Sequence, residues 1–182
     1  MNLFALLIAA TIPAAAPAKA PQAIAIHPGE TLTVQFEGRT PVVVQRGPAA
    51  PISAFETGMV RHLQRQEVPA GAGVQPAITV SKDEVAAEPP VPTPDRVQIT
   101  FRRIPGLRPG SEDHSLLFLV NGFGSSFRYR AVMHVGDRAV PTDVCEVRSN
   151  LSSSEHWPYV IDQIDLTSAW LEAPEPGNIR CE

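Results

Sequence analysis

The sequence predicts a mainly β protein, an antiparallel β-sandwich of immunoglobulin-like architecture with a proline-rich irregular excursion and one short helix. Three observations lead to this class. Apolar and polar residues alternate with a period of two in several short segments. Turn residues separate these segments, and the chain holds 19 prolines, 12 glycines and only 6% aromatic residues, which argues against a helical bundle. About seven or eight short strands result, as is typical of a sandwich or barrel.

The first twenty residues predict a secretory signal peptide. Residues 3–12 form an apolar run, which ends at Pro13 and is followed by the small residues of positions 14–20. This is the order of an apolar region of about ten residues before an A-x-A cleavage zone. A spanning helix needs roughly twenty apolar residues. We therefore expect residues 1–20 to be removed, residues 21–182 to form one domain without a membrane span, and the protein to be periplasmic or secreted.

The two cysteines, Cys145 and Cys181, agree with export. In an oxidising compartment, two cysteines are most simply interpreted as one disulfide bond. Closing a loop of about 36 residues stabilises the fold by about 3 to 4 kcal/mol in the chain-entropy model. A redox pair would show the C-x-x-C spacing, which is absent here. The bond is expected to tie the C-terminus to the domain.

The net charge argues against one class of binding partner. The net charge of −4 argues against a nucleic-acid partner, which calls for a basic domain. Arginine greatly outnumbers lysine, and alanine and proline are abundant, as expected for a bacterium with a GC-rich genome.

Residues 23–46 predict the first hairpin of the domain. Leu32, Val34 and Phe36 fall on one face of a strand, and threonine and glutamine residues fall on the other. Gly38 marks a turn, after which the returning strand covers residues 42–45. The alternation is that of half-buried strands.

Residues 47–94 are predicted to form a long irregular connection. One short helix lies within it, because three apolar residues follow each other at a spacing of four, although Gly58 weakens this prediction. A short strand is expected at 77–80 and an extended polyproline segment at 89–94. The three apolar helix positions are Phe55, Met59 and Leu63.

The strongest strand patterns follow. Residues 97–101 alternate cleanly, and residues 115–120 form a dense apolar strand. Asn121-Gly122 comes next and is a dipeptide that closes hairpins. It predicts that the strand at 126–135 pairs with the strand before it.

Two more strands complete the predicted sandwich. Gly136-Asp137 is the next turn signal and leads to a strand expected at 144–148. The last strand is expected within residues 161–171. In it Ile164, Leu166 and Trp170 alternate with polar neighbours, which places the three on one face.

An arginine face is the first candidate binding site. Arg128 and Arg130 share one face of their strand, and Arg102 lies in an earlier strand. If these strands pair side by side, the guanidinium groups converge and suit the bidentate capture of carboxylate or phosphate. The alternative is an ordinary solvated sheet face whose charges are paired with Glu and Asp.

The segment 152–159 is the second candidate, predicted to be a loop that collects hydroxyls, a carboxylate, an imidazole and two aromatic rings. Its predicted binding residues are His156, Trp157 and Tyr159. Ser154 and His156 resemble a nucleophile and base, but no G-x-S-x-G elbow surrounds them. The alternative is a loop whose two rings cap one end of the core.

The sequence predicts no metal site and no cofactor. None of the five histidines pairs with another at the spacing of H-E-x-x-H or H-x3-5-H. The acidic residues before His114 are interpreted as an exposed turn. The histidines are His27, His62, His114, His134 and His156.

Three functional hypotheses of different classes remain. The favoured one is a non-enzymatic periplasmic interaction module that presents the arginine face or the 152–159 segment to an envelope protein or an anionic ligand. The second is a secreted hydrolase that uses Ser154, His156 and a nearby carboxylate. The third is an accessory structural domain of an envelope assembly, in which the proline-rich stretch adds to the sheet edge of a neighbour.

Overall fold

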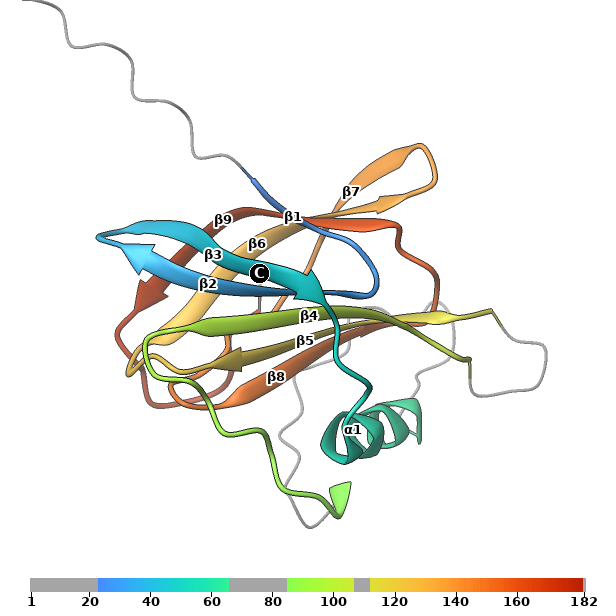
Figure 1. Ribbon diagram of the computed structural model, residues 1–182, viewed down its shortest axis with the longest axis horizontal. Helices are drawn as coiled ribbons and strands as arrows, with labels where there is room; N and C mark the ends of the chain where they lie inside the picture. Colours follow the sequence, from blue (N-terminus) through green and yellow to red (C-terminus); the bar gives the residue numbers. More distant parts are fainter. Residues whose placement is uncertain (1–22, 66–84, 107–111, 182) are drawn as a thin grey trace, which may run out of the picture.

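The computed structural model describes residues 23–65, 85–106 and 112–181, and it confirms a β-sandwich of two antiparallel sheets with one short helix (Figure 1). The predicted signal peptide and the predicted strand at 77–80 lie outside these residues. Among the described residues, no helix is long and apolar enough to cross a membrane. The elements in chain order are β1 (Ile24–Ile26), β2 (Glu30–Glu37), β3 (Thr40–Pro48), α1 (Ala54–Arg65), β4 (Val97–Ile104), β5 (His114–Asn121), β6 (Ser126–Val135), β7 (Arg138–Thr142), β8 (Ser152–Trp157) and β9 (Gln163–Glu172).

The two sheets pack face to face around one core. The four-stranded sheet has the order β1-β9-β6-β7, and the five-stranded sheet has the order β3-β2-β4-β5-β8. Alternate side chains of each strand point between the sheets and exclude water there. The predicted β2–β3 hairpin is confirmed, with Gly38 in the left-handed conformation at its turn. The largest fully buried core residues include Leu32, Ile99, Phe101, Leu117, Leu119, Phe127, Ile164 and Leu166.

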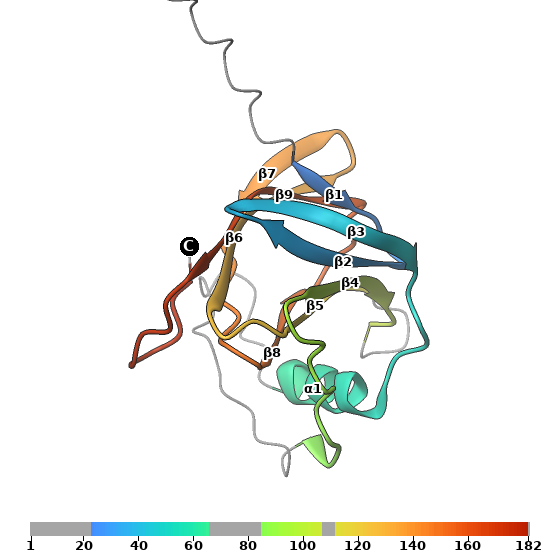
Figure 2. The same ribbon diagram turned by 60° about the vertical axis from the view of Figure 1, so that its left-hand side comes forward.

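Helix α1 forms a third layer on the outer face of the five-stranded sheet (Figure 2). Ser53 caps it, because the Glu56 N–H donates to Ser53 Oγ (3.1 Å) and the Ser53 N–H donates to Glu56 Oε2 (2.8 Å). Phe55 of the helix packs against Phe118 of β5, with ring centroids 6.2 Å apart. The predicted helix is thus confirmed. Gly58 is there for close packing, since an added Cβ would lie 2.5 Å from the carbonyl oxygen of Val85.

The predicted hairpin at Asn121-Gly122 is wrong, because β5 and β6 belong to different sheets. The Asn121 side chain instead stabilises the connection between the two sheets. Its Nδ2 donates to the carbonyl oxygens of Ser125 (2.8 Å) and Val147 (2.9 Å). Its Oδ1 accepts the N–H of Phe123 (3.0 Å). Gly122 leaves no room for a side chain, since an added Cβ would lie 1.8 Å from the carbonyl oxygen of Thr93. The dipeptide therefore carries the chain from one sheet to the other.

The strand predicted at 144–148 is also wrong. After the turn at Gly136-Asp137 the chain pairs at once, with Val135 opposite Arg138, and the resulting strand is β7. Residues 144–148 contribute only isolated bridges, one of which joins Val147 to Phe127 of β6.

The predicted placement of Trp170 on the same face as Ile164 and Leu166 is wrong because of a β-bulge in β9. Leu166 pairs with Ala131, but the next pair joins Ser168 to Arg130, so Thr167 has no partner opposite. One unpaired residue shifts the alternation by one position. Ile164 and Leu166 face the core, whereas Trp170 lies on the outer face beside Arg128, whose guanidinium carbon is 5.5 Å from the ring centroid.

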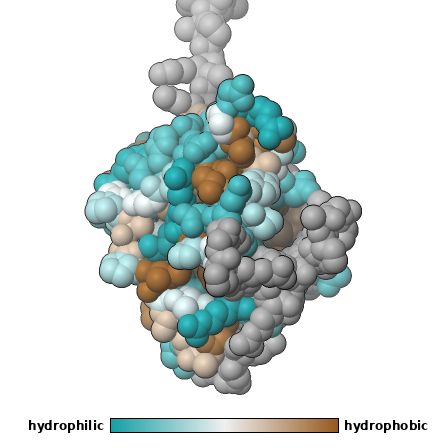
Figure 3. Space-filling model, turned by 90° about the vertical axis from the view of Figure 1, so that its right-hand side faces the viewer, coloured by the Kyte–Doolittle hydropathy of each residue, from teal (hydrophilic) through white to brown (hydrophobic). Residues whose placement is uncertain are grey.

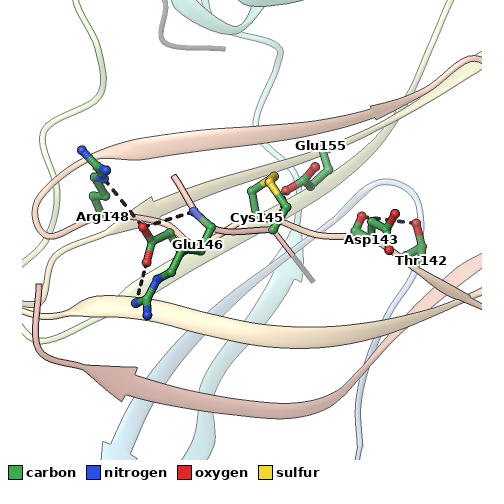
Figure 4. The surroundings of a disulfide bond; sticks show 8 residues. Thr142, Asp143, Cys145, Glu146, Arg148 and Glu155 are labelled. Carbon is green, nitrogen blue, oxygen red and sulfur yellow. Dashed lines mark hydrogen bonds and ion pairs between the residues drawn. A yellow bond between two sulfur atoms is a disulfide. The ribbon is translucent and has the colours of Figure 1, made fainter. Parts of the chain in front are cut away.

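The disulfide bond Cys145–Cys181 confirms the predicted tie of the C-terminus, and it closes a loop with a sequence separation of 36 residues. It holds in place a segment whose Arg180 pairs with three acidic residues, Glu146 (3.1 Å), Glu172 (3.0 Å) and Glu175 (3.2 Å). The Glu146 side chain is only 3% exposed, so losing Arg180 would leave a buried carboxylate with weaker compensation. Figure 4 shows Glu146 and Arg148 on one side of the bond and Glu155 on the other.

We predict that replacing both cysteines with serine lowers the free energy of unfolding by about 3 to 4 kcal/mol, because a closed loop of 36 residues restricts the unfolded chain. Urea unfolding of the oxidised protein and the variant measures this difference. Wild-type protein kept reduced is the matched control and should unfold like the variant. A loss below about 1 kcal/mol would show that the bond does not constrain the unfolded chain in this way.

Candidate functional site: the two faces of strand β8

The segment predicted as a loop at 152–159 is mostly a strand. Residues Ser152–Trp157 form β8, the edge strand that pairs antiparallel with β5. Because side chains alternate across a strand, the polar residues of β8 divide between two faces. Glu155, opposite the buried Leu117, points into the sandwich, and His156, opposite Leu116, points out beneath the helix layer. Sequence reasoning missed this strand because Ser-Ser-Ser-Glu shows no apolar alternation.

The inner face of β8 carries a carboxyl group inside the protein. The backbone N–H of Cys145 donates to Glu155 Oε1 (2.7 Å), which places this carboxyl group against the disulfide bond (Figure 4). Burial raises the pKa of Glu155 from 4.5 to about 7, although the Cys145 hydrogen bond opposes the shift. The carboxyl group therefore titrates near neutral pH.

Tyr129 of β6 faces the same interior space. Its buried hydroxyl group lies near the Glu155 carboxyl group and interacts with it. Burial, and then the charge of Glu155, raises the pKa of Tyr129 well above its ordinary value. The tyrosine therefore stays neutral, and Glu155 is the group in this space that changes charge near pH 7.

Both aromatic residues of the candidate segment belong to the core region. Trp157 is buried, and its Nε1–H donates to Thr142 Oγ1 (3.1 Å). Tyr159 is half-buried, and its hydroxyl donates to Met133 Sδ (3.4 Å). These contacts are the capping role that the sequence offered as the alternative to binding.

The outer face of β8 carries a histidine pair. His156 Nε2 lies 2.9 Å from His114 Nδ1, and the two ring centroids are 5.0 Å apart. His114 is 7% exposed, whereas His156 is half-buried. Burial, and then the charge of His114, lowers the pKa of His156 from 6.5 to about 4. His156 is therefore neutral at pH 7.

The groups of the predicted hydrolase are not brought together. Ser154 and His156 share the outer face of β8, but the His156 nitrogen contacts His114 rather than a serine hydroxyl. The neighbouring carboxylate, Glu155, points to the opposite face of the strand. A nucleophile, a base and an orienting acid must lie within hydrogen-bond reach of one another, and these three side chains do not.

The predicted convergence of the arginines is also wrong. Arg102 lies in the five-stranded sheet, where its Nε–H donates to Glu56 of α1 (2.9 Å). Arg128 lies in the four-stranded sheet and donates to Glu172 (3.1 Å). Arg130 follows Arg128 in β6 and is exposed. The pattern of alternation could not show that these strands belong to different sheets.

Strand β8 is therefore the candidate functional site, because adjacent residues carry pKa values shifted in opposite directions, and such shifts concentrate at functional sites. The fold and this site define a disulfide-bonded β-sandwich with titratable groups on both sides of an edge strand. Comparison with known proteins adds no resemblance, since no protein-family model, curated protein or solved structure matches the chain.

The two titrations predict opposing effects of pH on stability. The pKa of Glu155 is raised in the folded state, so its contribution falls as pH rises from 4.5 to about 7. The pKa of His156 is lowered in the folded state, so its contribution rises as pH rises from about 4 to 6.5. In the wild-type protein the two slopes largely cancel between pH 4.5 and 6.5.

Single substitutions separate these slopes. We predict that Glu155→Gln leaves a stability that rises with pH over this window, and that His156→Gln leaves one that falls, each by up to about 1.4 kcal/mol per pH unit. Urea unfolding at several pH values measures both slopes. The double variant is the control and should return to the flat wild-type profile. Parallel profiles for both single variants would contradict the assignment.

Proposed function

We propose that the protein is an exported, non-enzymatic interaction module of the bacterial envelope, and that it binds an envelope protein through its β6–β7 hairpin. Export is supported by the apolar run at residues 3–12 and by the disulfide bond, which persists in oxidising compartments.

The exposed apolar surface of the hairpin is the observation that carries this proposal. Strands β6 and β7 project from the body of the sandwich (Figure 1). Figure 3 shows apolar side chains gathered beside the hairpin tip. Val140 is 38% exposed, and its partner across the hairpin, Met133, is half-buried. Clustered exposed apolar side chains on a surface mark interaction sites more often than scattered ones do.

The surroundings of the hairpin favour a protein partner. Helix α1, the one helix among the described residues, packs on the five-stranded sheet. It therefore does not cover the four-stranded sheet or its hairpin. Arg138 is exposed on β7 two positions before Val140, so it lies on the same strand face and places a positive charge beside the apolar surface. An apolar centre with an arginine at its rim is the composition of protein interfaces. Arg128 and Arg130 lie on the opposite face of β6, where Arg128 bonds to Glu172.

The test is affinity capture from an envelope extract of the source bacterium, with the oxidised protein lacking residues 1–20 as bait. We predict that Val140→Asp and Arg138→Glu each weaken retention of one partner, Val140→Asp by about tenfold or more, since it places a charge in an apolar interface. Leu151→Asp is the matched control, because Leu151 is 54% exposed but lies outside the hairpin. Equal retention by wild type and Val140→Asp, or no retained partner at all, would contradict the proposal.

A further inference from the structure

We propose that His114 and His156 form a binding site for a late d-block divalent cation, with Cu(II) preferred over Zn(II). This site goes beyond the proposed interaction role, because it lies on the outer face of the five-stranded sheet, whereas the hairpin belongs to the other sheet. No spacing in the sequence indicated it, since the two histidines are 42 positions apart and are brought together by the pairing of β5 with β8.

The distance between the two nitrogens matches a shared metal ion. His114 Nδ1 and His156 Nε2 are 2.9 Å apart. Two metal–nitrogen bonds of about 2.0 Å place their nitrogens about 2.8 Å apart at a right angle and about 3.3 Å apart at the tetrahedral angle. The observed separation is closer to the right angle, which is the geometry of tetragonal Cu(II) rather than tetrahedral Zn(II).

The histidine pair lies beside an apolar cluster and is open to solvent on one side. Val60 of α1, Ile104 of β4 and Leu116 of β5 form an apolar cluster on the same outer face. Ile104 lies opposite His114 and Leu116 lies opposite His156 in the sheet, so the apolar cluster flanks both rings. His156 is only half-buried, which leaves a side from which a hydrated ion can enter.

Binding requires no net loss of protons. Without metal, one of the two facing nitrogens carries the hydrogen that the pair shares. When Cu(II) binds, that hydrogen moves through water to the other nitrogen of the same ring, and both facing lone pairs bond to the ion. Within the described residues no third His, Cys, Asp or Glu joins the pair, so water fills the remaining positions. Imidazole ligands favour Cu(II) over other divalent ions of the first row and over Mg²⁺ and Ca²⁺.

The experiment titrates the oxidised protein lacking residues 1–20 with Cu(II) alone, by calorimetry and by electron paramagnetic resonance. We expect one bound Cu(II) whose spectrum shows coupling to two imidazole nitrogens, and weaker binding of Zn(II) under the same conditions. His114→Gln and His156→Gln should each weaken Cu(II) binding by about tenfold or more and remove the two-nitrogen signal.

Two matched controls locate the site. His134→Gln removes a histidine that pairs with Asp165 on β9 instead, and His27→Gln tests chelation by the N-terminal region. Both should bind Cu(II) like the wild type. A wild-type spectrum without two imidazole nitrogens overturns the proposal whether or not the variants fold. Unchanged binding by folded His156→Gln also overturns it, and the pair is then a hydrogen bond only.

Discussion

Strand β5 is buried on both faces, and the rest of the structure depends on this burial. All eight of its residues are buried, because one face packs into the sandwich core and the other lies beneath the helix layer. A fully buried Leu, Val or Phe side chain contributes about 1.5 to 3 kcal/mol. Differences in β propensity span only about 1 kcal/mol per residue. Pairing with β5 can therefore hold the serine-rich β8 as a strand that its own sequence does not favour.

The position of β8 beside this buried strand explains the electrostatics of the site. The backbone pairing sends Glu155 into the sandwich and His156 toward the outer layer, so two adjacent residues lose water on opposite faces. Loss of water favours the neutral form of each group, which raises the pKa of a carboxyl group and lowers that of an imidazole. The disulfide-bonded Cys145 also lies on the inner face of β8, because its backbone N–H donates a hydrogen bond to Glu155.

The features that depend on local pattern could be predicted from the sequence, and those that depend on distant contacts could not. Alternation showed β2 and β4, the continuous apolar run at 115–120 showed β5, and the spacing of four residues showed α1. The connection at Asn121 depends on hydrogen bonds to residues more than twenty positions away, and the outward position of Trp170 depends on a bulge at Thr167. For the site, the sequence located the 152–159 segment but not its division between two faces. That division, like the separation of Arg102 from Arg128, follows from strand pairing that no local pattern records.

The most direct test of this account is a titration of the individual side chains of the oxidised protein by nuclear magnetic resonance. The carboxyl carbon of Glu155 and the imidazole of His156 report their own pKa values without any substitution. Burial on opposite faces of β8 predicts a pKa of about 7 for Glu155 and about 4 for His156. Values close to the ordinary 4.5 and 6.5 would mean that both groups remain in water, and they would contradict the seating of β8 against β5.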